Sequence, residues 1–261
     1  MGEPPAELRR RDRRLASSAP APPPTSAHLP PEHRRRWLIG TVVTVVLAVA
    51  AVVGGPWVYA NLTVPAPQDP LELSTQSPSP TVAPGPPAAM DVDGTWTIST
   101  GSQGGYRIGE VLSGESVVVA GRTDQVTGTV VVSGGALTTA RVVVDTASIS
   151  TDESARDAYF RRALDTTTFP EATFELSAPV DVSEVGTASG PVTVAAPGTL
   201  TLRGVAVPAT ANLELQRTVS GVEVVASVPL TLADVDLDPP ELGFVTVEPT
   251  GTIEILLVLV R

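Results

Sequence analysis

The sequence predicts an all-β domain, an antiparallel barrel or sandwich, joined to one N-terminal transmembrane helix. Three observations support this prediction. Residues 38–60 contain no charged side chain. Residues 91–261 consist mainly of short alternating or β-branched runs separated by turn signals, as in antiparallel strands. Residues 1–36 hold eight arginines and four acidic residues, whereas residues 61–261 hold nine arginines and twenty-four acidic residues.

Residues 1–36 form a predicted basic cytoplasmic tail. The density of proline and the low apolar content of this segment predict disorder. Its arginines, including the run RRRDRR that starts at Arg9, can contact anionic lipid headgroups or serve only as a topology signal. The run is short and has no aromatic neighbours, so we expect no binding to nucleic acid.

Residues 37–60 are predicted to form a transmembrane helix. The uncharged run that starts at Leu38 is long enough for a bilayer core, which needs about 20 apolar residues. Trp37 and Tyr59 lie near its ends, where interfacial aromatic side chains are common. Arginines precede the run and the next one is Arg107, so the positive-inside rule places the N-terminus in the cytoplasm and the large domain outside. A cleaved signal peptide is the alternative interpretation.

Residues 61–90 are rich in proline, serine and threonine and predict an extended linker. Such a chain rises by up to about 3.1 Å per residue, so it can hold the domain away from the membrane. Serine and threonine beside proline can also carry O-glycans in a segment of this kind.

The remaining residues, 91–261, are enough for one compact domain. Gly134-Gly135 and Ser220-Gly221 are turn signals between neighbouring strands. Ser150 and Glu153 have the spacing of a capping box and predict a helix that continues to Leu164. We expect strands at residues 96–99, 106–112, 115–122, 126–133, 137–149, 172–178, 193–205, 209–218, 221–230 and 251–260.

Periodicity alone does not choose between a barrel and a sandwich. The run from Ile253 to Val260 is apolar at nearly every position, so both faces of this strand are apolar. A sandwich core explains such a strand, and so does a barrel with an apolar interior.

Several motifs follow one another in a recognisable order. WTIST starts at Trp96 and YRIGEV at Tyr106, and the most specific stretch is VVVDTASISTDESARDAYFRRALDTTTFPEATFEL at residues 142–176. PGTLTLRGV at residues 197–205 and PLTLADVDLDPPELGFVTV at residues 229–247 complete the series. With these motifs, residues 94–260 resemble the YceI-like family of polyisoprenoid- and lipid-binding proteins.

The resemblance implies an antiparallel eight-stranded lipocalin-like barrel with one or two short helices and a long isoprenoid or fatty chain inside. It also implies a structural motif of Asp145, Arg156 and Asp157, in which the helix is tied to the barrel mouth. A surface ion pair and a contact to a ligand headgroup are the alternatives for Arg156 and Asp157. Family members often carry histidines early in the domain, but the matching stretch Gly101–Tyr106 has none, so a histidine contact to a headgroup does not carry over.

The residues present exclude several kinds of chemistry. The two histidines are His28 and His33, and no cysteine or lysine occurs anywhere in the chain. This excludes Ser-His-Asp and Cys-His catalysis, lysine Schiff bases and zinc sites built on histidine or cysteine in the domain. The alternating acidic residues from Asp234 to Asp238 lack the glycine and distal glutamate of a calcium loop. We therefore predict no catalytic residue, no metal, no cofactor and no enzymatic activity.

The sequence as a whole predicts a binding protein anchored in the membrane, with its domain outside the cytoplasm. The expected ligand is an apolar lipid or polyisoprenoid inside the barrel. The alternative is an envelope interaction domain whose barrel is filled with side chains and whose partner is a protein that the sequence does not identify. Candidate lining residues are Tyr106, Ile108, Val142, Val144, Phe169, Phe174, Leu200, Leu202 and Phe244.

Overall fold

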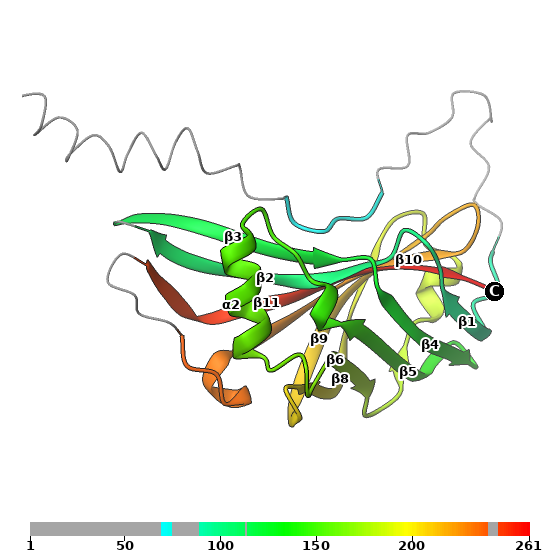
Figure 1. The fold of residues 1–261 in the computed structure, drawn as a ribbon. Helices are drawn as coiled ribbons and strands as arrows, with labels where there is room; N and C mark the ends of the chain where they lie inside the picture. The colour runs from blue at the N-terminus through cyan, green and yellow to red at the C-terminus, as the bar shows by residue number, and fades with distance from the viewer. Residues whose placement is uncertain (1–68, 75–88, 113, 240–244) are drawn as a thin grey trace, which may run out of the picture. The chain divides into compact units, whose positions relative to one another are not determined.

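The computed structural model describes residues 69–74, 89–112, 114–239 and 245–261 (Figure 1). The predicted tail, the predicted transmembrane helix and most of the linker lie outside these ranges. Within them, no helix is both long enough and apolar enough to cross a bilayer.

Across the described residues, eleven strands form one antiparallel sheet. Eight of these strands close into a barrel in the order β1, β4, β5, β6, β8, β9, β10, β11, because β1 pairs with β11 as well as with β4. This confirms the predicted antiparallel eight-stranded barrel. The bounds are β1 Gly94–Ile98, β2 Gln103–Leu112, β3 Glu115–Thr123, β4 Val126–Ser133, β5 Ala136–Asp145, β6 Glu171–Leu176, β7 Val180–Asp181, β8 Val192–Leu202, β9 Val205–Arg217, β10 Val222–Thr231 and β11 Val245–Val260.

The sheet extends beyond the closed barrel on one side. The long strand β11 pairs with β1 near its C-terminal end and with β2 over the rest of its length. The hairpin of β2 and β3 therefore continues the sheet from β11 without being one of the eight closing strands. The short strand β7 pairs only with β5 in the described part of the chain.

The helices lie in connections between strands. The described residues include α2 at Ser154–Ala163 and the 3-10 helices η1 at Thr146–Ser148, η2 at Ser183–Gly186 and η3 at Leu232–Val235.

The predicted capping box at Ser150 is wrong. The N-cap of α2 is Glu153, whose carboxylate accepts a hydrogen bond from the Ala155 N–H at 3.2 Å. Ser150 instead exchanges two backbone hydrogen bonds with Arg122 of β3. This bridge holds Ser150 in the sheet, so the helix starts only after the chain has left it.

Two tight turns fix the register of neighbouring hairpins. Gly134 and Gly135 join β4 to β5 with φ angles of 62° and 76°, the left-handed conformation that a two-residue hairpin turn needs. This confirms the predicted turn. Arg203 and Gly204 join β8 to β9 in the same way, with φ angles of 53° and 75°. The strand predicted at residues 193–205 runs through this turn, so the prediction did not separate β8 from the start of β9.

Alternation along the strands separates the interior of the barrel from its outside. In β9, for example, Ala211, Leu213 and Leu215 are buried, whereas the residues between them are exposed. The buried side chains form a large cluster and a smaller one that consists of Leu164, Leu202 and Val235. In the smaller cluster, Leu164 follows α2, Val235 belongs to η3 and Leu202 belongs to β8.

Candidate functional site

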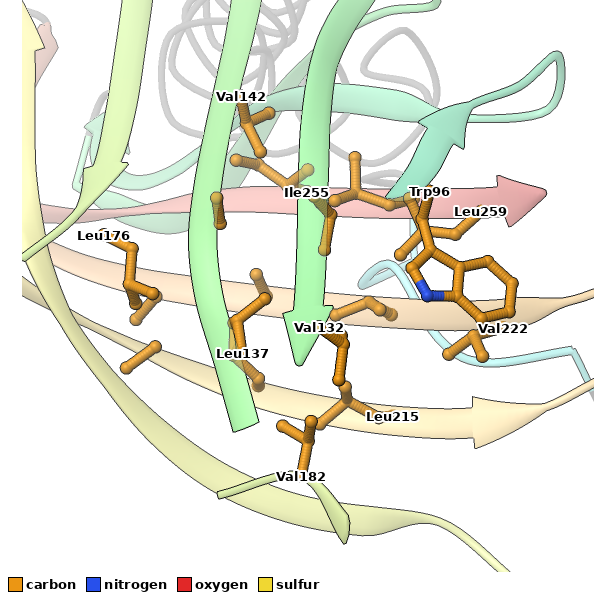
Figure 2. A pocket seen from close by; sticks show the side chains of 18 of the residues that line it. Trp96, Val132, Leu137, Val142, Leu176, Val182, Leu215, Val222, Ile255 and Leu259 are labelled. Carbon is orange, nitrogen blue, oxygen red and sulfur yellow. The ribbon is translucent and has the colours of Figure 1, made fainter. Parts of the chain in front are cut away.

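An apolar cavity of about 80 Å³ lies inside the barrel (Figure 2). All eight barrel strands contribute side chains to its wall, together with Val92 before β1 and two residues at η2. The lining residues are Val92, Trp96, Val130, Val132, Leu137, Ala140, Val142, Phe174, Leu176, Val182, Val185, Ala196, Ala211, Leu213, Leu215, Val222, Val224, Ala226, Val228, Ile255, Leu257 and Leu259.

The wall offers no hydrogen bond to a ligand or to water. Trp96 is the one lining residue in the described part of the chain with a polar side-chain atom. Its indole N–H donates to the Val92 carbonyl at 2.9 Å and is therefore already satisfied. Water enters a cavity when polar groups can bind it, whereas a purely apolar cavity stays dry and accepts apolar molecules. The cavity therefore favours a hydrocarbon ligand.

Small side chains leave this space open. Alanines occupy lining positions on strands from both sides of the barrel, and Ala196 of β8 lies directly opposite Ala211 of β9 in the sheet register. A leucine at either position would project into the space that the cavity now occupies. The hollow region thus results from residues whose side chains end at Cβ, at interior positions that elsewhere carry valine or leucine.

One end of the cavity is closed by the chain before β1. Val92 packs there together with Val182 and Val185, and the Met90 N–H donates to the Gly186 carbonyl at 2.8 Å. Trp96 also lines the cavity (Figure 2).

Polar contacts on the outside hold this closing segment. The Asp93 carboxylate accepts hydrogen bonds at 2.8 Å from the backbone N–H groups of Gly134 and Gly135. These bonds, the one from Gly135 first, lower the pKa of Asp93 below its ordinary value. The guanidinium of Arg261 lies 4.7 Å from the centre of the Trp96 ring and donates to the Asp93 carbonyl at 2.8 Å. The segment is thus fixed to the β4–β5 turn and to the residue after β11.

Phe174 lies at the other limit of the cavity. It lines the cavity, and its neighbours across the sheet are Val142, which also lines it, and Leu200, which does not. Its ring lies so close to Gly198 that a Cβ on that residue would be 2.3 Å from the ring carbon Cζ. The Phe174 ring can therefore occupy this position only because residue 198 is a glycine.

The structure separates the predicted lining residues into groups. Val142 and Phe174 line the cavity. Val144, Leu200 and Leu202 are buried but do not line it. Leu200 lies opposite Phe174 in the register, whereas Val144 and Leu202 lie farther along their strands. These positions have the inward orientation that alternation predicted.

The remaining predicted residues lie outside the cavity wall. Tyr106 stacks on Phe160 with ring centres 4.8 Å apart, and burial raises the pKa of its hydroxyl above the ordinary range. Ile108 lies on β2 opposite Gly251, beyond the closed barrel. Phe169 is 38% exposed and packs against Gly204 in the β8–β9 turn. Phe244 lies outside the described residues.

Most of the wall was not predicted from the sequence. Four of the nine predicted lining residues are aromatic, whereas the cavity is lined mainly by valine, leucine and alanine, and β9, β10 and β11 supply ten lining residues that were not predicted. A usable signal was present in the alternation of Ala211, Leu213 and Leu215 and of the even-numbered residues from Val222 to Val228. Where such an inward-facing series contains a small residue such as alanine, the interior of a barrel of this size can be hollow at that position along the strand.

The predicted structural motif connects α2 to the rest of the domain. Asp145 accepts a hydrogen bond from the Ala147 N–H at 2.9 Å and caps η1. Arg156 lies 3.5 Å from Glu110 of β2 and 2.8 Å from Asp152. Asp157 accepts from both the N–H and the hydroxyl of Thr151. Arg156 and Asp157 thus bind different partners, and Arg156 joins the helix to the sheet. None of the three lines the cavity.

The described residues also give no sign of a metal centre, since no three acidic side chains in those ranges are grouped closely enough to hold a cation. The alternating acidic residues Asp234, Asp236 and Asp238 do not form such a group either.

Comparison with known proteins identifies the domain. The model of the YceI-like domain family matches residues 96–259. A polyisoprenoid binding domain from Saccharophagus degradans, implicated in plant cell wall breakdown, has a TM-score of 0.51 at 21% identity over 64% of this chain and 98% of its own. BcnA from Burkholderia cenocepacia has a TM-score of 0.47 at 16% identity over 60% of this chain and 96% of its own. No curated protein matches the chain. The family match spans more than half of the sequence, and the chain therefore belongs to the YceI-like domain family.

Proposed function

We propose that this protein is a non-catalytic binding protein for an apolar lipid or polyisoprenoid chain, anchored by residues 37–60 with its barrel outside the cytoplasm. The observation that carries the proposal is the cavity, whose lining offers only apolar contacts. The membership of the YceI-like family and the likeness to a solved domain named polyisoprenoid binding support the same ligand class. Anchoring rests on the uncharged run and the arginines before it.

The size of the cavity indicates how much of a ligand it holds. An apolar cavity of about 150 Å³ binds one benzene molecule, so a cavity of about 80 Å³ has space for about three carbon-sized groups. Each buried methylene contributes about 0.8 kcal/mol, which gives about 2–3 kcal/mol for such a section of chain. A longer ligand must leave the cavity at one end or displace side chains at the other end of the barrel. Each further methylene that it buries adds to the binding without a polar contact.

Organic extraction of the full-length protein purified in detergent, followed by mass spectrometry, tests the proposal. We expect an apolar lipid to copurify with the wild type. The Ala211→Leu variant should lose at least about nine-tenths of it, because the larger side chain enters the cavity and displaces more than one methylene. The Asn212→Leu variant is the matched control, since the neighbouring residue is exposed on the outside of the same strand.

Two outcomes would contradict the proposal. One is a wild-type protein that yields no specific lipid, which would favour the alternative of an interaction domain with a protein partner. The other is an equal lipid content in both leucine variants, which would place the lipid outside the barrel. Thermal unfolding of both variants shows whether a loss of lipid is simply a loss of fold.

A further inference from the structure

Part of the predicted linker lies against the outside of the barrel. Residues 69–74, drawn in cyan in Figure 1 and called the strap below, are hydrogen-bonded to the sheet at both ends. At one end, Arg122 of β3 donates to the Asp69 carbonyl at 3.3 Å. At the other end, the N–H and the hydroxyl of Ser74 donate to Glu223 of β10 at 2.9 and 2.7 Å. Gln216 of β9 donates to the Ser74 carbonyl at 3.3 Å.

The strap has the alternation of an extended segment on a surface. Leu71 and Leu73 are half-buried, whereas Pro70, Glu72 and Ser74 are exposed. Residues two apart in an extended chain point to the same side, so both leucines face the same way. Because both ends of the strap are bonded to the barrel, that side is the one toward the sheet.

The Arg122 anchor is fixed by the sheet beneath it. Arg122, Gly105 and Glu254 are register neighbours on β3, β2 and β11, so they lie in one row on the outer face. Gly105 has no side chain, and Arg122 reaches across it to place its Nη2 atom 2.5 Å from Glu254. Arg107 pairs with the same carboxylate at 2.9 Å. With a side-chain exposure of 9%, Arg122 is held in place and presents its guanidinium to the strap.

The strap explains an unusual feature of β11. After Glu254, this strand is apolar on its outer face, at Leu256, Val258 and Val260, as well as on its inner face. Leu256 is paired with Val225, and this row lies between the row of Glu254 and the row in which Val258 is paired with Glu223. The two anchors of the strap therefore bracket an apolar strip on the outside of the barrel, and leucines at alternate positions suit such a strip.

We infer that the outer face of β10, β11, β2 and β3 is a docking surface for residues 69–74 of the same chain, and that docking shortens the tether of the barrel. The second part rests on the proposed function, in which residues 37–60 span the membrane. Eight residues, 61–68, then separate the membrane from the strap and reach at most about 28 Å. A chain released back to Met90 would reach about 100 Å. The docked strap therefore holds the barrel near the lipid surface from which we propose that it takes its ligand.

Cysteine labelling of the full-length protein in detergent tests the docking itself, because the chain has no native cysteine. We expect the Leu73→Cys variant to react with a maleimide about tenfold more slowly than the Glu72→Cys variant, since position 73 is protected until the strap opens. Adding Glu223→Ala to Leu73→Cys should remove most of this protection. Adding Glu214→Ala, a change at an exposed glutamate of β9, should leave it. Equal rates for both reporters, or equal effects of both alanine substitutions, would overturn the docking.

Energy transfer in liposomes tests the effect on reach. A dye on a Thr210→Cys variant of the full chain, at an exposed position of β9, should transfer energy to a bilayer acceptor. We expect Glu223→Ala to lower the transfer and Glu214→Ala to leave it unchanged. Unchanged energy transfer with Glu223→Ala would overturn the inference that the docked strap shortens the tether. The docking of the strap itself would still be tested by the labelling rates. A protein that does not float with liposomes would refute the membrane segment in the proposed function, and the labelling result would stand independently.

Discussion

The hollow and filled halves of the barrel interior are built from the same strands. They differ in the side chains that the segments between the strands place in the interior. In the filled half, Leu164 from the chain after α2 and Val235 from η3 pack against Leu202 of β8. In the hollow half, Val185 of η2 and Val92 close the end, and alanines such as Ala211 leave the middle open. A cavity in this barrel therefore depends on the length of the side chains in its wall. It also depends on how far the segments at the two ends of the barrel reach into the interior.

The largest expected difference between the halves concerns the loss of a leucine. Leu202→Ala should lower the free energy of unfolding by about 4–5 kcal/mol, because Leu202 packs in the filled half with Leu164 and Val235 and its loss leaves a new cavity. Leu213→Ala should cost about 2–3 kcal/mol, because Leu213 already borders empty space and has fewer contacts to lose. Urea denaturation of the two variants, measured under conditions that remove any lipid, gives both values. Equal losses would show that the two halves are equally packed.

A smaller effect is expected at the boundary between the halves. Gly198→Ala should destabilise the protein by about 1–3 kcal/mol, because its Cβ would collide with the Phe174 ring and push it toward the cavity. Gly190→Ala provides the control, since no atom lies within 4 Å of the position of its added Cβ. Thermal unfolding compares the two. If Gly198→Ala is as stable as the control, the ring is not held in place by the glycine.

The smallest effect is expected at the segment that closes the hollow half. The pKa of Asp93 is lowered in the folded state by its bonds to Gly135 and Gly134, so its contribution to stability is complete above the unfolded value of about 3.9 and is lost as the pH falls below it. The Asp93→Asn variant has no carboxylate to protonate. We expect the melting temperature of the wild type to fall more steeply than that of the variant between about pH 4 and pH 2. Parallel curves would refute the contribution of this carboxylate.

The sequence was sufficient for most of the strands and insufficient for the cavity. Alternation located β4 at residues 126–133 and Gly134-Gly135 marked its turn, because both signals are local. Closure into a barrel depends on which strands pair, and the prediction of a barrel came from the resemblance to a family and not from periodicity. The filled half depends on Leu164 and Val235, whose inward packing is decided by the path of irregular connections. The strap could not be predicted, since six residues with two leucines resemble the rest of a linker.

Barrel closure has a consequence for how the protein folds. Thr97 and Ile98 of β1 pair with Val260 and Leu259 of β11, so the strands that complete the barrel are separated by about 160 residues. Contacts so distant in sequence form slowly, because a long loop must close before any interaction rewards it. Until β11 pairs with β1, the folding chain presents the interior face of an open sheet. The barrel is complete only after that event, and an apolar molecule near the nascent sheet can be enclosed as the final seam forms.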